Sequence, residues 1–270
     1  MNKLEAFGYI TAQAARGEIS FPTSVNAVLR LQLALDDPDC HVDEAIRLVL
    51  SEPQLAARTV ALANTAVFSA GGLQVTNVRA AVLRIGYRRL RGLVAALMVR
   101  QFGHRIADPT LRAKARQLWT HCAHVAALAQ ALARHVTRVD PDTALFAGIV
   151  HEVGGFYLLS RADEFPGLLE DDHDNWGALC EDVVGAQVMR KLAIPQDVAQ
   201  AVEGLRDGLP NPQPHTLLDT LLLANRLAPI ASPLGAAVPD GAPAIDEVIL
   251  QQLRTEAAET VEALGTATLV

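Results

Sequence analysis

The sequence has few of the residues and runs that mark secreted or membrane-spanning proteins. It holds three cysteines, no CxxC pair and no run of 18 apolar residues. An odd number of widely spaced thiols does not form a disulfide framework, and a membrane-spanning helix needs about 20 apolar residues. The first ten residues also lack the basic and then apolar stretch of a secretory signal. We therefore expect a cytoplasmic protein without membrane contact, with reduced thiols at Cys40, Cys122 and Cys180.

Aromatic residues are also scarce, at 4% of the 270 residues, whereas half of the residues are hydrophobic. Alanine and leucine dominate, which favours helix, because aromatic and β-branched side chains are the ones enriched in strands. We find no convincing strict alternation of apolar and polar residues, and apolar residues instead recur at steps of three and four. The sequence therefore predicts an all-α protein, long enough to bury a core in one large domain or in two small lobes.

Breaks in the apolar pattern divide the chain into predicted helices. They cover residues 4–16, 22–36, 43–50, 53–64, 76–100, 111–136, 141–159, 178–192, 195–205, 217–227 and 245–264. The stop at Ala107-Asp108-Pro109 divides an N-terminal helical lobe, residues 1–106, from a second helical lobe, residues 107–270. The helix from residue 141 is apolar on most sides, so we expect it to be buried. Residues 229–243 are dense in Pro, Gly and Ala and predict an exposed loop.

A basic surface is missing as well, since the net charge is −7 and the overall field repels nucleic acid and anionic lipid. One local group of arginines is the exception: Arg84, Arg88, Arg89, Arg91 and Arg100. Apolar residues lie between them at helical spacing, which is typical of the solvated face of an amphipathic helix. A site for an anion or a partner is the alternative. We expect no nucleic-acid partner.

Two imidazoles and one carboxylate are the candidates for a chemical site. His121 lies near the apolar stripe of its predicted helix, and His151-Glu152 lies inside the most apolar one, where a polar pair is costly unless it is satisfied. Imidazole and carboxylate together suit a divalent transition metal. Spacing alone leaves two interpretations open. One is a buried, hydrogen-bonded His–Glu pair that fixes helix packing, and the other is a metal site.

Three segments, in order, resemble the HD phosphohydrolase superfamily: Trp119-x-His121, residues 147–154 with His151-Glu152, and residues 223–228 with Asn225. In that superfamily four such groups hold one or two divalent ions, and a metal-bound water attacks a phosphoester. The resemblance implies a metal site of His121, His151, Glu152 and Asn225. Glu152 and Asn225, however, stand where aspartates are expected. The longer carboxylate and the neutral amide predict a degraded site without catalytic residues or cofactor, holding at most a weakly bound Fe, Mn, Zn or Mg ion.

The N-terminal half resembles the HDOD family, which shares the HD-like half. Residues 52–68 resemble its signature DPxLxxxxLxxANSAxF, residues 78–86 resemble the segment that follows, and Phe21-Pro22 resembles its opening motif. The matched signature residues are Pro53, Leu62, Asn64, Phe68 and Gly86. For Asn64 the alternative is a role in ending its helix. The family often has a histidine where this chain has Glu181.

The resemblance implies a bacterial signal-transduction module that binds a regulatory protein or a small molecule. HDOD proteins are often fused to receiver or cyclic-di-nucleotide domains, which this chain does not carry. The implied partner is therefore a separate receiver or cyclic-di-nucleotide signalling protein. The alternative function is that of a metal-dependent phosphohydrolase acting on a nucleotide or a cyclic dinucleotide, with a metal held by His121, His151 and Glu152.

Overall fold

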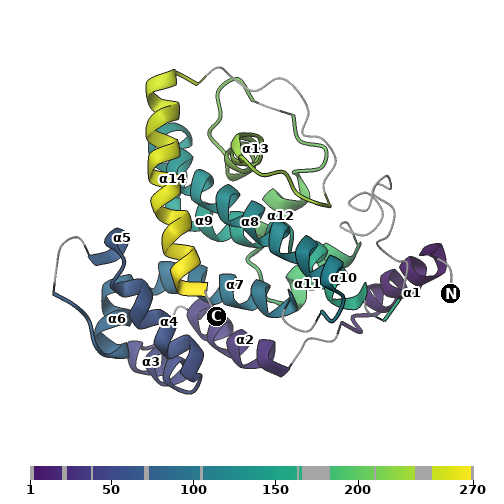
Figure 1. Ribbon diagram of the computed structural model, residues 1–270, viewed down its shortest axis with the longest axis horizontal. Coiled ribbons are helices and arrows are strands. Elements are labelled where there is room, and N and C mark those ends of the chain that lie inside the picture. The colour runs from purple at the N-terminus through teal and green to yellow at the C-terminus, as the bar shows by residue number, and fades with distance from the viewer. Residues whose placement is uncertain are drawn as a thin grey trace.

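A computed structural model describes residues 3–19, 23–37, 39–69, 73–103, 106–162, 164–165, 183–209, 211–234 and 245–268. Within these residues the regular structure is helical, without strands, as predicted (Figure 1). The first half of the chain forms α1 (Lys3–Ala15), α2 (Thr23–Asp36), α3 (Val42–Leu50), α4 (Pro53–Ala63), α5 (Ala66–Ser69), α6 (Val78–Ile85) and α7 (Tyr87–Gly103).

The second half continues with a long helix, α8 (Pro109–Leu132), whose last turn widens into the π-helix η1 (Ala133–Thr137). Then follow α9 (Pro141–Val150), α10 (Val153–Ala162), α11 (Ala186–Lys191), α12 (Gln196–Glu203), α13 (Leu217–Leu227) and α14 (Glu247–Thr268). Aspartates and proline start two of these helices as the sequence predicts. Asp108 and Asp140 accept backbone hydrogen bonds at the N-termini of α8 and α9, and Pro109 and Pro141 occupy the first turn.

Two predicted helices are each broken once. The helix predicted over residues 76–100 is α6 followed by α7, because Gly86 between them has φ +78° and ψ 161°. That region of backbone space is open essentially to glycine alone. The apolar pattern of the sequence continues through Gly86, but the helical backbone ends there. The helix predicted over residues 141–159 is interrupted at His151-Glu152, which form the turn between α9 and α10.

The centre of the molecule is the crossing of α8 and α9, with α7 and α10 packed beside them. A Cβ on Gly148 would lie 2.4 Å from the Cα of Ala126, so the two backbones touch at this point. Among the described residues one segment, Pro141–Ala162, has the length and hydropathy of a membrane span, but 89% of its apolar window is buried inside the protein. It is the core pair α9 and α10, which agrees with the predicted burial.

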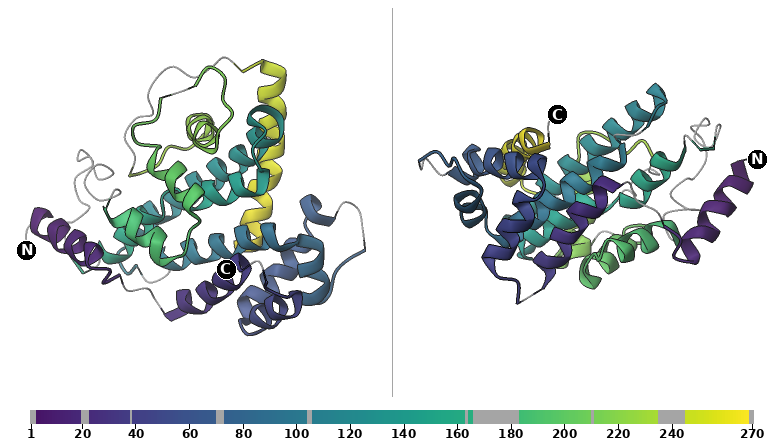
Figure 2. Two further views of the ribbon diagram at one scale, coloured as in Figure 1. Left: turned by 180° about the vertical axis from the view of Figure 1, so that it is seen from behind. Right: turned by 90° about the horizontal axis from the view of Figure 1, so that it is seen from below.

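The C-terminal helix α14 connects the two halves of the chain. It lies along α8 and continues onto α4 and α5 of the N-terminal half, as the yellow helix in Figure 1 and its end-on view in Figure 2 show. Its buried face consists of Leu253, Ala257, Thr260, Ala263 and Leu264. Helix α7 likewise packs against α9 and α10 across the boundary predicted at residue 106. The division into two lobes stays a prediction.

The signature residues Pro53, Leu62, Asn64 and Phe68 each have a structural role in or next to α4. Pro53 lies in the first turn of α4, and Leu62 is buried. Asn64 closes the end of α4, where its amide donates to the carbonyls of Val60 and Val75 and its oxygen accepts from Val75 N–H at 2.8 Å. The alternative predicted for Asn64, a role in ending its helix, therefore matches its contacts. Phe68 lies under the Arg89 guanidinium.

The arginines between residues 84 and 100 are engaged within the molecule. Arg84 donates to backbone carbonyls of Ala63 and Leu73, and Arg100 stacks over Trp119. The three others face aspartates of other helices or their caps, in the pairs Arg88–Asp140, Arg89–Asp142 and Arg91–Asp36. The predicted solvated helix face therefore describes these arginines only in part, because three of them also form ion pairs with other helices or their caps. Phe21-Pro22, Cys180 and Glu181 lie outside the described residues.

Candidate metal centre

The structure brings His121, His151 and Glu152 together from one helix and the turn between two others. His121 projects from α8, and His151 and Glu152 form the turn that ends α9. Their candidate ligand atoms all lie within 4.8 Å of one another. All three residues are buried, with 1%, 7% and 6% of their surface exposed. The close crossing at Gly148 explains the proximity, because it lies one helical turn before His151 and sets α9 directly against α8.

Backbone carbonyls fix which ring nitrogen of each histidine carries hydrogen. His121 Nδ1 lies 2.7 Å from the carbonyl oxygen of Ile230, and His151 Nδ1 lies 2.8 Å from that of Gly148. A carbonyl can only accept, so each Nδ1 is the donor and each neutral ring keeps its lone pair on Nε2. The two Nε2 atoms face each other at 3.3 Å. A bound metal ion or a shared proton would satisfy this pair of lone pairs.

The surroundings disfavour a proton there. Burial lowers the pKa of His151 to about 3, with a further contribution from the neighbouring His121, and the bond to Gly148 opposes the shift only in part. Burial also lowers the pKa of His121, despite the hydrogen bond to Ile230. Both rings are therefore neutral at pH 7. The contacts between these imidazoles and Glu152 are then not ion pairs.

The hydrogen-bonded His–Glu pair, one of the two interpretations that the sequence leaves open, is not formed by these atoms. Glu152 Oε1 lies 3.6 Å from His121 Nε2 and 3.8 Å from His151 Nε2, and both distances are longer than a hydrogen bond. Instead, Nε2 of each ring and Oε1 of Glu152 lie within 3.8 Å of one another. The turn between α9 and α10 lets two successive residues, His151 and Glu152, each contribute an atom to this group.

This donor set fits a divalent transition metal. Two nitrogens bound to Zn²⁺ in tetrahedral geometry, at bond lengths of about 2.0–2.1 Å, lie roughly 3.3–3.4 Å apart, close to the observed Nε2 separation. The second nitrogen of each ring donates to a carbonyl, which is the usual arrangement behind a metal-bound histidine. Nitrogen ligands favour Zn or Fe over Mg. Asn225 lies half-buried on α13, and its role as a fourth ligand stays a prediction.

Residues 230–234 cover this cluster, and the sequence did not reveal their role. They follow α13 directly, and they were predicted to belong to an exposed loop. Ser232 Oγ donates to Glu152 Oε2 at 2.8 Å, and the Ile230 carbonyl accepts from His121. Leu234 packs over Gly155, where a Cβ would lie 2.6 Å from its Cδ1. The prediction of an exposed loop over residues 229–243 is wrong for residues 230 and 232–234, which are half-buried and bond to or pack on the groups beneath them. Residues 229 and 231 are exposed, and residues 235–243 lie outside the described residues.

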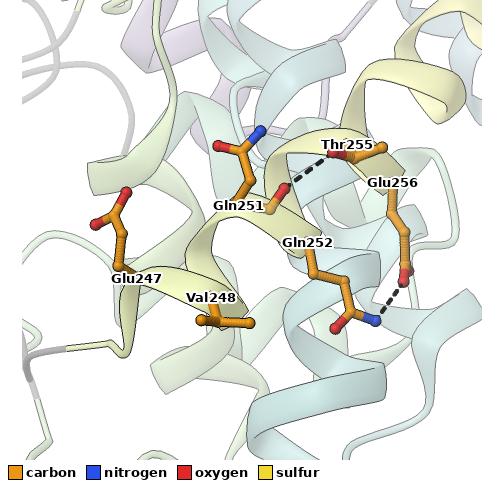
Figure 3. A pocket seen from close by; sticks show the side chains of 6 residues that line it. All are labelled: Glu247, Val248, Gln251, Gln252, Thr255 and Glu256. Carbon is orange, nitrogen blue, oxygen red and sulfur yellow. Dashed lines mark hydrogen bonds between the residues drawn. The ribbon is translucent and has the colours of Figure 1, made fainter.

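A surface pocket lies apart from the histidine cluster. It is lined by residues of α14 alone: Glu247, Val248, Gln251, Gln252, Thr255 and Glu256 (Figure 3). Gln252 donates to Glu256 at 3.1 Å, and Thr255 donates to the carbonyl of Gln251 at 3.0 Å. Glu256 also bonds to His135 of η1 at 2.7 Å. This open face contains no residue of the histidine cluster.

Comparisons with known proteins give the family and the fold of the chain. The family model described as the HDOD domain matches residues 21–203. An HDOD domain protein of unknown function from Geobacter sulfurreducens superposes with a TM-score of 0.69 at 22% identity, over 99% of this chain and 100% of that one. A candidate metal-dependent phosphohydrolase from Shewanella amazonensis SB2B gives 0.65 at 17%, over 96% and 99%. A candidate signal transduction protein from Marinobacter aquaeolei VT8 gives 0.58 at 18%, over 99% and 67%. No curated protein sequence matches the chain.

Proposed function

The chain belongs to the HDOD domain family, and we propose on this premise that it is a bacterial signal-transduction module that binds a partner in the cytoplasm. The observation that carries the proposal is the enclosure of the histidine cluster. His121 is 1% exposed, and Glu152 is bonded to Ser232 of the chain itself. A phosphoester could reach these atoms only after residues 230–234 move. The enclosed state therefore favours a structural or regulatory role over turnover.

The ligand types support the same proposal. Glu152 and Asn225 stand where the phosphohydrolase pattern has aspartates, so the site has one negative charge fewer than that pattern and a longer carboxylate. Less charge means a weaker hold on a cation and less activation of its water. We propose that a metal, if held by His121, His151 and Glu152, stabilises the fold of the module and does not drive catalysis.

The convergence of three lone pairs favours a second candidate function, that of a metal-dependent phosphohydrolase. A divalent ion in such a site would polarise a phosphoester and lower the pKa of its water. In that case the chain's own part would be limited. Glu152 and the two imidazoles would hold the ion, and the carbonyls of Ile230 and Gly148 would keep both rings in the required tautomer.

One experiment separates the two functions. The purified chain and His151→Ala are loaded with Mn²⁺, Fe²⁺ or Zn²⁺, their metal content is measured by mass spectrometry, and hydrolysis of bis(p-nitrophenyl) phosphate and of a cyclic dinucleotide is followed. The signalling proposal expects the same background rate for both proteins. Turnover that falls by roughly 100-fold or more on His151→Ala, at least the loss typical when a residue that only supports a metal ligand is removed, would establish the phosphohydrolase instead.

Partner binding is tested directly on the full chain. Purified receiver proteins and a cyclic dinucleotide are titrated into it in a calorimeter, at two salt concentrations, with a double variant Arg88→Glu, Arg89→Glu as the comparison. The proposal expects saturable binding with a Kd in the micromolar range or below, which corresponds to about −8 kcal/mol. Absence of binding to both classes would reject these partners.

A further inference from the structure

Residues 230–234, which we call the strap, are attached to the histidine cluster at several points. The Ile230 carbonyl accepts from His121 Nδ1 at 2.7 Å, and Ser232 Oγ donates to Glu152 Oε2 at 2.8 Å. The backbone N–H of Leu234 donates in turn to Ser232 Oγ at 3.1 Å, which fixes the hydroxyl from its other side. Two of the three candidate ligands are thus held by the strap.

The apolar end of the strap closes the same region. The side chain of Leu234 lies over Gly155 on α10, beside Leu118, which is one helical turn before His121. Any side chain at Gly155 would collide with it, because a Cβ there would lie 2.6 Å from Leu234 Cδ1. The fit of a leucine into the space left by a glycine shows that the strap is seated and is not simply lying across the surface.

The hydrogen bonds that hold the strap differ in strength, and this affects how readily the strap can open. One bond involves a carboxylate and is therefore the stronger kind, whereas the others are between neutral groups. Residues 229 and 231, on either side of its first residue, are exposed, and residues 230, 232, 233 and 234 are half-buried. A segment held by few contacts on one side opens more readily than the helices beneath it.

We infer that the strap governs access to the histidine cluster, with Ser232 as the residue that positions Glu152. When the strap is closed, Ser232 turns Glu152 Oε1 toward the two Nε2 atoms, and the cluster is shut off from solvent. When the strap opens, both imidazoles become reachable by solute. The inference rests on the proposed function in one respect, since it takes this cluster as the functional site, but it holds whether the site carries metal or not.

The strap is connected through Ala228 and residue 229 to the end of α13, so a movement of α13 would also move the strap. Helix α13 ends at Leu227, the backbone of Ala228 is extended, and the strap begins two residues later. A partner that displaced the end of α13 would therefore pull on the strap and change the exposure of His121 and His151. Access to the cluster is in this way coupled to a surface element.

The experiment measures the reactivity of single histidines in metal-free, full-length protein. Diethyl pyrocarbonate modifies accessible, neutral imidazoles, and peptide mass spectrometry gives a separate rate for each. His215, whose side chain is 73% exposed, serves as the internal reference. In the wild type we expect His121 and His151 to react at least ~10-fold more slowly than His215, because reaction requires local opening.

The variants Ser232→Ala and Leu234→Ala should raise the rates of His121 and His151 by roughly 5-fold or more, since each removes one attachment of the strap. Ser232→Thr, which keeps the hydroxyl, should restore slow reaction. The matched control is Ser51→Ala, which removes a hydroxyl bonded to Leu48 far along the chain and should leave both rates unchanged. Circular dichroism and the thermal unfolding midpoint show that each variant is folded.

Unchanged rates in both strap variants would overturn the inference, and so would fast modification of both histidines in the wild type. A rise that is equally large in Ser51→Ala would also overturn it, because the effect would then come from general loosening. None of these outcomes depends on bound metal, on turnover or on a partner. Failure of the strap inference and failure of the proposed function are therefore separate results.

Discussion

Gly148 occupies the point at which α9 crosses α8, and its lack of a side chain is what allows His151 to approach His121. A Cβ at this position would lie 2.4 Å from one backbone atom of Ala126 and 2.8 Å from another. Backbone cannot move aside as a flexible side chain can. The same residue supplies the carbonyl that fixes the tautomer of His151. One glycine therefore determines both the distance and the chemical state of the cluster.

Gly148→Ala should destabilise the protein by about 3 kcal/mol, at the upper end of the cost of overpacking a close contact. The free energy of unfolding from urea titration measures it. Gly8→Ala is the matched control, because Gly8 lies within α1 and a Cβ there meets nothing within 4 Å. The control should be neutral or slightly stabilising, by up to ~1 kcal/mol, since alanine favours helix. Equal effects of the two substitutions would contradict this account of the crossing.

The side chain of Asn64 makes three hydrogen bonds to backbone groups of Val60 and Val75. Asn64→Ala should cost about 2 kcal/mol, because it removes three hydrogen bonds and leaves the N–H of Val75 without its acceptor. Asn64→Asp should not rescue stability, because a carboxylate would face the carbonyls of Val60 and Val75. Thr65→Ala, which loses a single hydroxyl bond to Leu62, should cost less than ~1 kcal/mol. Thermal and urea unfolding of the three variants tests this order.

At this scale the sequence predicted part of the site. His121, His151 and Glu152 could be found because polar residues in apolar helices need partners. The strap could not be found, since its contacts use a backbone carbonyl and a serine hydroxyl that any loop possesses. Its position depends on the path of the chain after α13, which carries no periodic signal.

At the scale of helices, the breaks at Gly86 and at His151-Glu152 determine the directions of the side chains that follow them. Apolar periodicity located most helices within a few residues, because burial of one face is what a helix pattern records. It could not locate the break at Gly86, since a glycine inside such a pattern is usually tolerated. The turn at His151-Glu152 was missed for a similar reason. Both sides of it are apolar, and the pattern does not register an interruption of two residues.

Gly86→Ala tests the first of these breaks. A Cβ at Gly86 would meet nothing within 4 Å, so any cost comes from the backbone conformation at φ +78°. We expect a loss of about 1–3 kcal/mol. Gly103→Ala is the comparison, because that glycine is helical and a Cβ there makes an ordinary contact of 3.5 Å with Ala115. If the helix between α6 and α7 were continuous in solution, Gly86→Ala would stabilise the protein instead.

At the scale of the whole molecule, α14 connects the two halves of the chain, and Glu256 is its main polar contact with η1, the π-helix that follows α8. It bonds to His135 at 2.7 Å and lies 3.4 Å from Arg134. Burial alone would raise the pKa of Glu256, but the bonds from Gln252 and His135 outweigh it, and the pKa lies below its usual value of 4.5. The folded state therefore favours the carboxylate.

The lowered pKa of Glu256 makes the stability of the protein depend on pH. A carboxyl whose pKa is lower in the folded state adds stability above its unfolded pKa, and this stability is lost as the pH falls through the folded pKa. Glu256→Gln should therefore cost up to ~1 kcal/mol at pH 5.5 and almost nothing at pH 2.5. Urea unfolding at both pH values measures the difference. Val261→Ala, a nearby apolar change, should cost the same at both; a pH-independent cost of Glu256→Gln would contradict the assignment.

The position of α14 also bears on how the protein is made. Helix α4, which α14 covers, leaves the ribosome roughly 190 residues earlier, and at a synthesis rate of about 5–20 residues per second this interval is on the order of 10–40 s. During that time the face of α4 that packs against α14 in the folded protein is exposed to solvent. Nascent chains of this protein should therefore depend on chaperones that bind apolar surfaces until translation ends.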